Sequence, residues 1–201
     1  MLIVLFKIIV VLFSVVIHEV SHGLMAYRLG DPTAKRLGRL TLNPFPHLDL
    51  FGSIILPVLS LILGGFIFGY AKPVPYNPLF LRDQKYGPAK VGFSGPASNL
   101  VLAIIFGLIL RFLPPFLYQT SIPELFTFIV SMNLILAIFN LMPVPPLDGH
   151  WLLLSFLPDR FYRLKQMYSQ YGLLLFFVFL FIVFPLILPL VEILFRLIVG
   201  V

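Results

Sequence analysis

Long apolar stretches separated by short polar segments form the dominant pattern of this sequence. Four stretches reach or exceed the roughly 20 residues that a helix needs to span a bilayer, at about residues 2–27, 91–113, 123–142 and 171–199. They are too long and too numerous for the strands of a membrane β-barrel, which are about ten residues long and alternate in polarity. The pattern therefore predicts an all-α polytopic membrane protein, with a core of three transmembrane helices followed by a C-terminal helical segment.

A fifth apolar stretch, residues 50–70, is interrupted by Pro57 and by the pair Gly64 and Gly65. Basic residues cluster on both sides of this stretch and again after residue 142, whereas the connection 114–122 has none. The positive-inside rule places all three clusters in the cytoplasm, which requires residues 50–70 to enter and leave on one side. We therefore expect a re-entrant segment here, tolerated where protein covers its backbone; a spanning helix is the alternative. The clusters are Arg28, Lys35, Arg36 and Arg39; Lys72, Arg82, Lys85 and Lys90; and Arg160, Arg163 and Lys165.

Two further segments complete the expected organisation. The sequence "RLGRLTL", residues 36–42, is typical of a short strand near the membrane surface. The last apolar stretch, 171–199, contains Pro185 and Pro189 and is either one kinked helix or a helical hairpin. With no internal repeat or appended soluble domain apparent, we expect one integral-membrane domain over 1–201, with its core at about 2–155.

Composition supports this membrane assignment. The chain is 60% hydrophobic and 11% charged, whereas soluble domains carry about a quarter charged residues. Its net charge of +6 comes from short loops, where basic residues act as topology signals and contact anionic lipid. We therefore expect a multi-pass protein of the plasma (inner) membrane with no nucleic-acid partner. The absence of cysteine excludes disulfides and thiolate metal ligands.

The first apolar stretch contains the motif "HEVSH", with His18, Glu19 and His22. Side chains at positions i and i+4 share a helix face, so both imidazoles can bind one metal ion. The pattern H-E-x-x-H is that of zinc metalloproteases, in which the glutamate is a general base rather than a ligand. Charged residues at the centre of a spanning helix cost about 2.5–3.5 kcal/mol each, so a functional reason for them is favoured. The alternative is a metal-ion or proton transporter that uses the same residues.

A catalytic zinc ion needs a third protein ligand and an open position. The candidates outside the first helix are Asp148, His150, His47, Asp49, Glu124 and Glu192. The helices at 91–113 and 123–142 return the chain to the side where His22 lies, and Asp148 follows there. Pro143, Pro145 and Pro146 impose extended backbone, and Gly149 permits a sharp turn. Asp148 is therefore the expected third ligand, although "LDG" is also an ordinary turn sequence.

The motifs "HEVSHG", "FSGPASNL" and "NLMPVPPLDG", in this order, resemble those of the site-2 protease family of intramembrane metalloproteases. The resemblance covers about residues 10–155. The stretches "GDPTAKRLGRLTLNP" and "GYAKPVPYNP" are similar to the small prokaryotic branch without PDZ or CBS domains. The resemblance implies that His18, His22 and Asp148 bind one Zn²⁺ and that Glu19 is the catalytic base.

Asparagines in the apolar stretches need hydrogen-bond partners. Asn140 is a candidate donor to the substrate carbonyl or the developing oxyanion, and the family places its asparagine at this position beside the metal. For Asn133 an interhelical hydrogen bond is favoured. Asn99 repeats with Gly95, Ala103 and Gly107 every four residues, a spacing typical of close helix packing. The sequence leaves the roles of Asn99, His47 and Asp49 open.

These observations together predict an intramembrane zinc metalloprotease. Its expected substrate is a transmembrane segment of another protein, which must unwind locally because an intact helix hides its amides. The strand expected at 36–42 could hold the unwound segment by β-augmentation.

Overall fold

A computed structural model describes residues 2–49, 51–55, 59, 62 and 72–200, and its described residues form helices and no strand. Helices long and apolar enough to cross a membrane are α1 (Leu2–Arg28), α4 (Gly87–Arg111), α5 (Ile122–Leu141) and the run Gly172–Val199. That run comprises α8 (Gly172–Val178), the π-helical turn η6 (Phe179–Val183) and α9 (Phe184–Val199). The prediction of an all-helical membrane protein is confirmed. The shorter elements are α2 (Thr33–Arg36), η1 (Phe45–His47), η2 (Phe51–Ile55), η3 (Pro78–Phe80), η4 (Pro115–Gln119), α6 (Gly149–Phe156), η5 (Asp159–Phe161) and α7 (Tyr162–Gln170).

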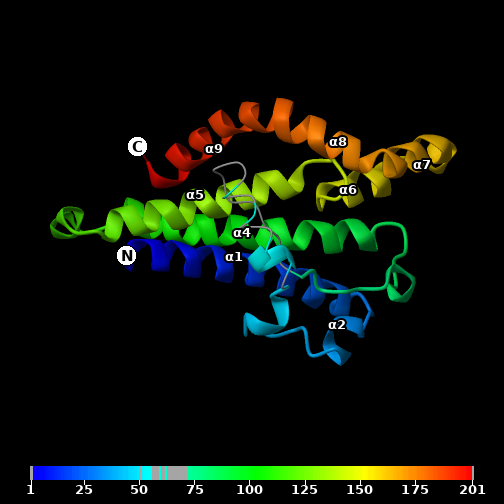
Figure 1. Ribbon diagram of the computed structural model, residues 1–201, viewed down its shortest axis with the longest axis horizontal. Helices are drawn as coiled ribbons and strands as arrows, with labels where there is room; N and C mark the ends of the chain where they lie inside the picture. The colour runs from blue at the N-terminus through cyan, green and yellow to red at the C-terminus, as the bar shows by residue number, and fades with distance from the viewer. Residues whose placement is uncertain (1, 50, 56–58, 60–61, 63–71, 201) are drawn as a thin grey trace.

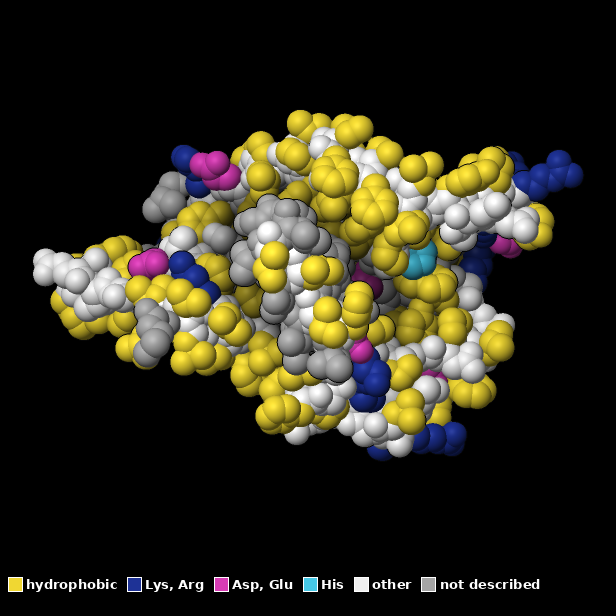
Figure 2. All heavy atoms as spheres, viewed as in Figure 1, with side chains coloured by type: hydrophobic (Ala, Val, Ile, Leu, Met, Phe, Trp, Pro, Cys, Tyr) yellow, Lys and Arg dark blue, Asp and Glu magenta, His cyan; other side chains and the backbone are white. Residues whose placement is uncertain are grey.

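The spanning helices run up and down, so that their connections gather at two ends (Figure 1). The N-terminus, η4 and the C-terminus lie at one end, whereas α2, α6 and α7 lie at the other. The three basic clusters follow α1, precede α4 and follow α5, so they belong to the second end. This arrangement agrees with the positive-inside rule. Hydrophobic side chains cover most of the face seen in Figure 2, as expected for a surface in contact with lipid.

Helix α4 lies at the centre of the bundle and contacts α1, α5, α6 and α9. Because lipid tails are as apolar as the helices, close van der Waals packing holds such helices together rather than exclusion from water. Small residues of α4 permit that packing: Ala103 is fully buried, and a Cβ at Gly107 would lie 2.4 Å from Ile198 Cγ2 of α9. The small-residue face predicted at four-residue spacing therefore packs inside the bundle.

The C-terminal segment is one interrupted helix and not a hairpin. Pro185 lies in the first turn of α9 and Pro189 inside it. Each proline removes a backbone N–H that would otherwise bond one turn back, and the π-helical turn η6 precedes them. Figure 1 shows the run arching over α5, where Phe139 of α5 contacts Phe179 and Phe184.

The strand predicted at residues 36–42 is wrong. Arg36 ends α2, Gly38 reverses the chain with φ of +65°, and bends follow. Such a left-handed conformation suits glycine and breaks an extended run. The Arg39 guanidinium donates to the carbonyl of Lys72 at 2.8 Å, so a side chain rather than a backbone ladder ties this segment to the chain after residue 71. Most of the expected re-entrant segment, 50–70, lies outside the described residues.

The orientation of the bundle can be tested by single cysteines, because the chain has none of its own. Lys35→Cys, Lys85→Cys and Gln119→Cys each place a thiol on an exposed residue of a connection. We expect an impermeant maleimide to label the first two only from the cytoplasmic side and the third only from the opposite side. Labelling of the first two from opposite sides would contradict the arrangement and make residues 50–70 a span.

Candidate metal centre

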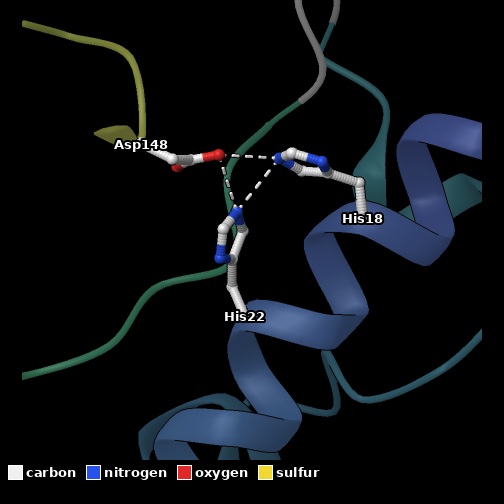
Figure 3. Close-up of side chains that lie close together, drawn as sticks. All are labelled: His18, His22 and Asp148. Atoms are coloured by element: carbon white, nitrogen blue, oxygen red, sulfur yellow. Dashed lines mark hydrogen bonds and ion pairs between the residues drawn. The ribbon is translucent and has the colours of Figure 1, made fainter. Parts of the chain in front are cut away.

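Helix α1 presents His18 and His22 on one face, one turn apart, as the spacing of four residues requires. Both residues are buried, with 6% and 8% of their surface exposed. Their Nε2 atoms lie 3.0 Å apart, and the two rings meet edge to face (Figure 3).

Asp148 lies close to both histidines, although it is 126 residues after His22 in the chain. It belongs to the segment between α5 and α6. Its Oδ2 atom lies 2.9 Å from His18 Nε2 and 3.2 Å from His22 Nε2. The turn depends on Gly149, because a Cβ there would lie 2.1 Å from the carbonyl oxygen of Leu141. The start of α6 therefore passes directly against the end of α5, which directs Asp148 towards α1.

Helix α4 leaves room for this meeting by carrying glycine where it faces the centre. A Cβ at Gly95 would lie 2.4 Å from His22 Nε2 and 2.7 Å from His18 Nε2, and one at Gly92 would lie 2.8 Å from the Asp148 carbonyl oxygen. The sequence pattern predicts only helix packing for Gly95, so its clearance of the two imidazoles was not predicted. A glycine at four-residue spacing is expected both for helix packing and for clearance at this centre, so no sequence signal separates the two roles.

The other ring nitrogen of each histidine is also bonded. His22 Nδ1 lies 2.7 Å from the carbonyl oxygen of Val91, and His18 Nδ1 lies 2.6 Å from Oδ1 of Asn99. Both partners belong to α4. Each imidazole is therefore held at Nδ1 and directs Nε2 towards Asp148.

The donor set fits a zinc ion. One ligand atom from each of His18, His22 and Asp148 lies within 4.8 Å of the others, and two imidazoles with one carboxylate are a common catalytic zinc set. Burial raises the pKa of Asp148, but the neighbouring imidazoles of His18 and His22 outweigh this effect and bring the pKa to about 2. The carboxylate is thus ionised, as a metal ligand must be.

Glu19 lies beside this group but is not part of it. Its Oε2 atom accepts a hydrogen bond of 2.8 Å from the backbone N–H of Val74. The extended segment around Val74 therefore lies against Glu19 and orients its carboxylate. A backbone donor has no sequence signature, and this contact was not predicted.

Among the described residues, no contact of its amide brings Asn140 to the centre. Its Nδ2 donates to the Leu136 carbonyl oxygen one turn back, at 2.9 Å. Asn133, by contrast, bonds to Asn99 across the interface of α4 and α5 at 2.8 Å, so the predicted interhelical hydrogen bond is confirmed.

The remaining candidate ligands have other partners. Glu124 pairs with Lys7 at the opposite end of α1, and Glu192 pairs with Arg196 on its own helix. His150 bonds the Leu147 carbonyl, His47 bonds the Thr41 carbonyl, and Asp49 accepts from the backbone N–H of Gly52. Within the described part of the chain, only His18, His22 and Asp148 form a group of three potential metal ligands.

The clearance at Gly95 can be tested by adding one methyl group. In Gly95→Ala the new Cβ collides with both Nε2 atoms, and these rings cannot retreat without losing their Nδ1 bonds. We expect zinc affinity, measured by chelator competition, to fall about 10-fold or more. Gly107→Ala on the same helix is the control, since it meets Ile198 instead and should cost about 1–3 kcal/mol of stability while zinc affinity stays unchanged. Equal zinc affinity in both variants would refute the assigned role of Gly95.

Comparison with known proteins agrees with this geometry. The family model described as peptidase family M50 matches residues 6–119 and 116–184. YwhC of Bacillus subtilis is 35% identical over 179 residues, covering 86% of this chain and 78% of its own. Rip2 of Mycolicibacterium smegmatis is 33% identical over 168 residues, covering 82% and 62%, and MJ0611 of Methanocaldococcus jannaschii is 31% identical over 100 residues, covering 49% and 48%.

The names of these relatives class all of them as candidate zinc metalloproteases. No solved structure matches the chain. A family match over most of the sequence, together with a relative above 30% identity along most of both chains, establishes the relationship. The chain therefore belongs to peptidase family M50, the site-2 protease family of membrane zinc metalloproteases.

Proposed function

We propose that this protein hydrolyses a peptide bond in or near a transmembrane segment of another membrane protein, using His18, His22 and Asp148 as zinc ligands and Glu19 as general base. The observation that carries the proposal is the meeting of Asp148 with both histidines inside a bundle of spanning helices. Glu19 follows His18 directly in α1, so the carboxylate belongs to the same turn as the ligands.

His18, His22 and Asp148 would hold the zinc ion, which would act as a Lewis acid that lowers the pKa of a water molecule towards 7 and polarises the scissile carbonyl. Glu19 accepts the proton of the attacking water and returns it to the leaving amine. The hydrogen bond from Val74 N–H holds the Glu19 carboxylate in place for this exchange. The histidines and Asp148 serve only as ligands and stay fixed in place while this exchange occurs.

The depth of the site suits a substrate embedded in the membrane. His22 lies six residues before Arg28, the last residue of α1, which corresponds to about 9 Å along the helix. Asp148 is the more accessible ligand, with 21% of its side chain exposed. Water therefore reaches the centre from the end that carries α2, α6 and α7, which the positive-inside rule assigns to the cytoplasm. The substrate helix must unwind before its amide meets the site.

Asn140 is proposed as a donor to the substrate carbonyl. Its Nδ2 now bonds the Leu136 carbonyl, and the side chain would exchange this partner for the substrate. Loss of an oxyanion donor costs about 10²–10³-fold in kcat. Asn140→Ala should therefore cleave far more slowly with zinc content unchanged, and cleavage at the wild-type rate would remove Asn140 from the mechanism.

The spanning helices and basic connections also indicate the membrane and the partners of the protein. We place the protein in the plasma (inner) membrane, with residues 1–201 forming one integral-membrane domain. Its partners are the bilayer and a transmembrane protein substrate, and the basic residues at the α2 and α7 end contact anionic lipid. No role with nucleic acid is proposed.

The protease and transporter alternatives differ in what Glu19→Gln does. The amide keeps the size of Glu19 but cannot accept the proton, so cleavage of a single-pass substrate should fall by at least about 10²-fold. Zinc content, measured by elemental analysis of the purified protein, should stay near one ion per chain. Glu124→Gln is the matched control, because it removes a carboxylate at the other end of the bundle and should leave cleavage intact.

Asp148→Ala gives the complementary result. Only two ligands remain, so zinc should be lost together with cleavage. Full zinc occupancy in this variant would show that Asp148 is not a ligand, and undiminished proteolysis by Glu19→Gln would remove Glu19 as the base.

A further inference from the structure

A chain of buried amides lies behind His18, on the side away from Asp148. His18 Nδ1 lies 2.6 Å from Oδ1 of Asn99, whose Nδ2 lies 2.8 Å from Oδ1 of Asn133. Asn99 and Asn133 are both fully buried. They come from α4 and α5, so the chain links the metal centre on α1 to two other spanning helices.

Backbone carbonyls determine which way each amide points. Asn133 Nδ2 lies 2.9 Å from the Ile129 carbonyl oxygen, and Asn99 Nδ2 lies 3.2 Å from the Ser14 carbonyl oxygen. A carbonyl oxygen can only accept a hydrogen bond, so each amide must direct its NH₂ group at that carbonyl. Turning either amide over would set two oxygen atoms against each other in an apolar interior, which is strongly unfavourable.

The orientation of Asn99 then fixes the tautomer of the His18 ring. Since Oδ1 of Asn99 faces Nδ1 and can only accept, Nδ1 must carry the hydrogen. In a neutral imidazole the other nitrogen is then an acceptor, and for His18 that nitrogen is Nε2, which faces Asp148 and His22. A metal ion requires this lone pair.

Ser14 closes the arrangement. It lies one turn before His18 on α1 and is buried; its hydroxyl oxygen accepts from Asn133 Nδ2 at 3.0 Å. Asn133 therefore contacts α1 directly as well as through Asn99, and α1, α4 and α5 are joined at one level of the bundle. The polar groups of Ser14, Asn99 and Asn133, which would be unfavourable in an apolar interior without partners, thus form hydrogen bonds with one another.

We propose that Asn99 is a positioning residue for zinc binding, and that Asn133 acts through it by holding the Asn99 amide in the orientation that leaves His18 Nε2 free for the metal. The proposal rests on the zinc site proposed above. His22 does not need such a relay, because its Nδ1 donates to a backbone carbonyl, that of Val91.

Zinc affinity provides the first test, measured by competition with a chelator on the full chain in detergent. Asn99→Leu removes the acceptor at similar side-chain volume and should weaken zinc binding about 10–100-fold, as loss of the hydrogen-bond partner of a ligand does. Asn133→Leu should weaken it less, and the double variant should bind no more weakly than Asn99→Leu. Independent, additive losses would show that Asn133 does not act through Asn99.

Ser98→Ala is the matched control on α4, since its hydroxyl bonds the Gly95 carbonyl of its own helix. Its zinc affinity should equal that of the wild type. If Asn99→Leu fails to fold, Asn133→Leu carries the test, because it keeps the acceptor opposite His18 Nδ1 but removes the oxygen that holds the Asn99 amide. Wild-type zinc affinity in a well-folded Asn133→Leu would overturn the relay.

The tautomer itself provides a readout that a packing defect does not mimic. The chain has four histidines, so the ¹⁵N signals of His18 in metal-free protein can be assigned by comparison with His18→Ala. We expect hydrogen on Nδ1 in the wild type and a shift towards hydrogen on Nε2 in Asn99→Leu. An unchanged tautomer together with unchanged zinc affinity would refute the proposal.

His18→Ala separates failure of this inference from failure of the zinc site. If His18→Ala loses zinc while Asn99→Leu retains full affinity, the site stands and the positioning role falls. If His18→Ala also keeps zinc, the metal binds elsewhere, and both the site and the relay are wrong.

Discussion

The contact between Asp148 and the two histidines of α1 is the constraint on which the rest of the structure depends. It joins residues 130 and 126 positions apart in the chain, and it succeeds only if α4 and α5 cross and return to the correct end. The glycines at 92, 95 and 149 serve this contact, since a Cβ at any of them would strike a ligand or the chain that carries it. Much of the close packing around α4 is thus needed to bring the three residues of the centre together.

Part of this structure could be predicted from the sequence. Four spans follow from length and apolarity, the pairing of His18 with His22 follows from helical spacing, and the basic clusters set the parity of the connections. Together these placed Asp148 at the correct end without knowledge of the turn. These predictions succeed because each depends on a local periodicity of the sequence or on a rule that the bilayer imposes on it. Both can be read from a single sequence.

The remainder depends on tertiary contacts that a sequence does not display. The segment 36–42 has the apolar alternation of a strand, yet Gly38 and the Arg39 contact with Lys72 give it a turn instead. Asn99 and Asn140 are equally polar in equally apolar helices, but only the first contacts a histidine. Residues that bond through backbone groups, such as Val91 and Val74, leave no trace in side-chain chemistry.

Buried polarity has a different meaning in this bundle than in a water-soluble core. Apolar side chains cannot select one helix arrangement over another when lipid solvates all of them equally well. A buried amide is more selective than an apolar side chain, because any helix arrangement that leaves it without hydrogen-bond partners is unfavourable. The Asn99 and Asn133 pair therefore favours one relative placement of α1, α4 and α5, and the same placement completes the metal centre.

The hydrogen bond from Val74 to Glu19 has a consequence for the chain that supplies it. Val74 stands between Pro73 and Pro75, neither of which has an N–H. Within "PVP" there is thus a single donor, and sliding the segment by one residue in either direction would bring a proline opposite the carboxylate. Glu19 can be satisfied there in one register only. The same hydrogen bond consequently orients the proposed general base and sets the register of residues 73–75 beside it.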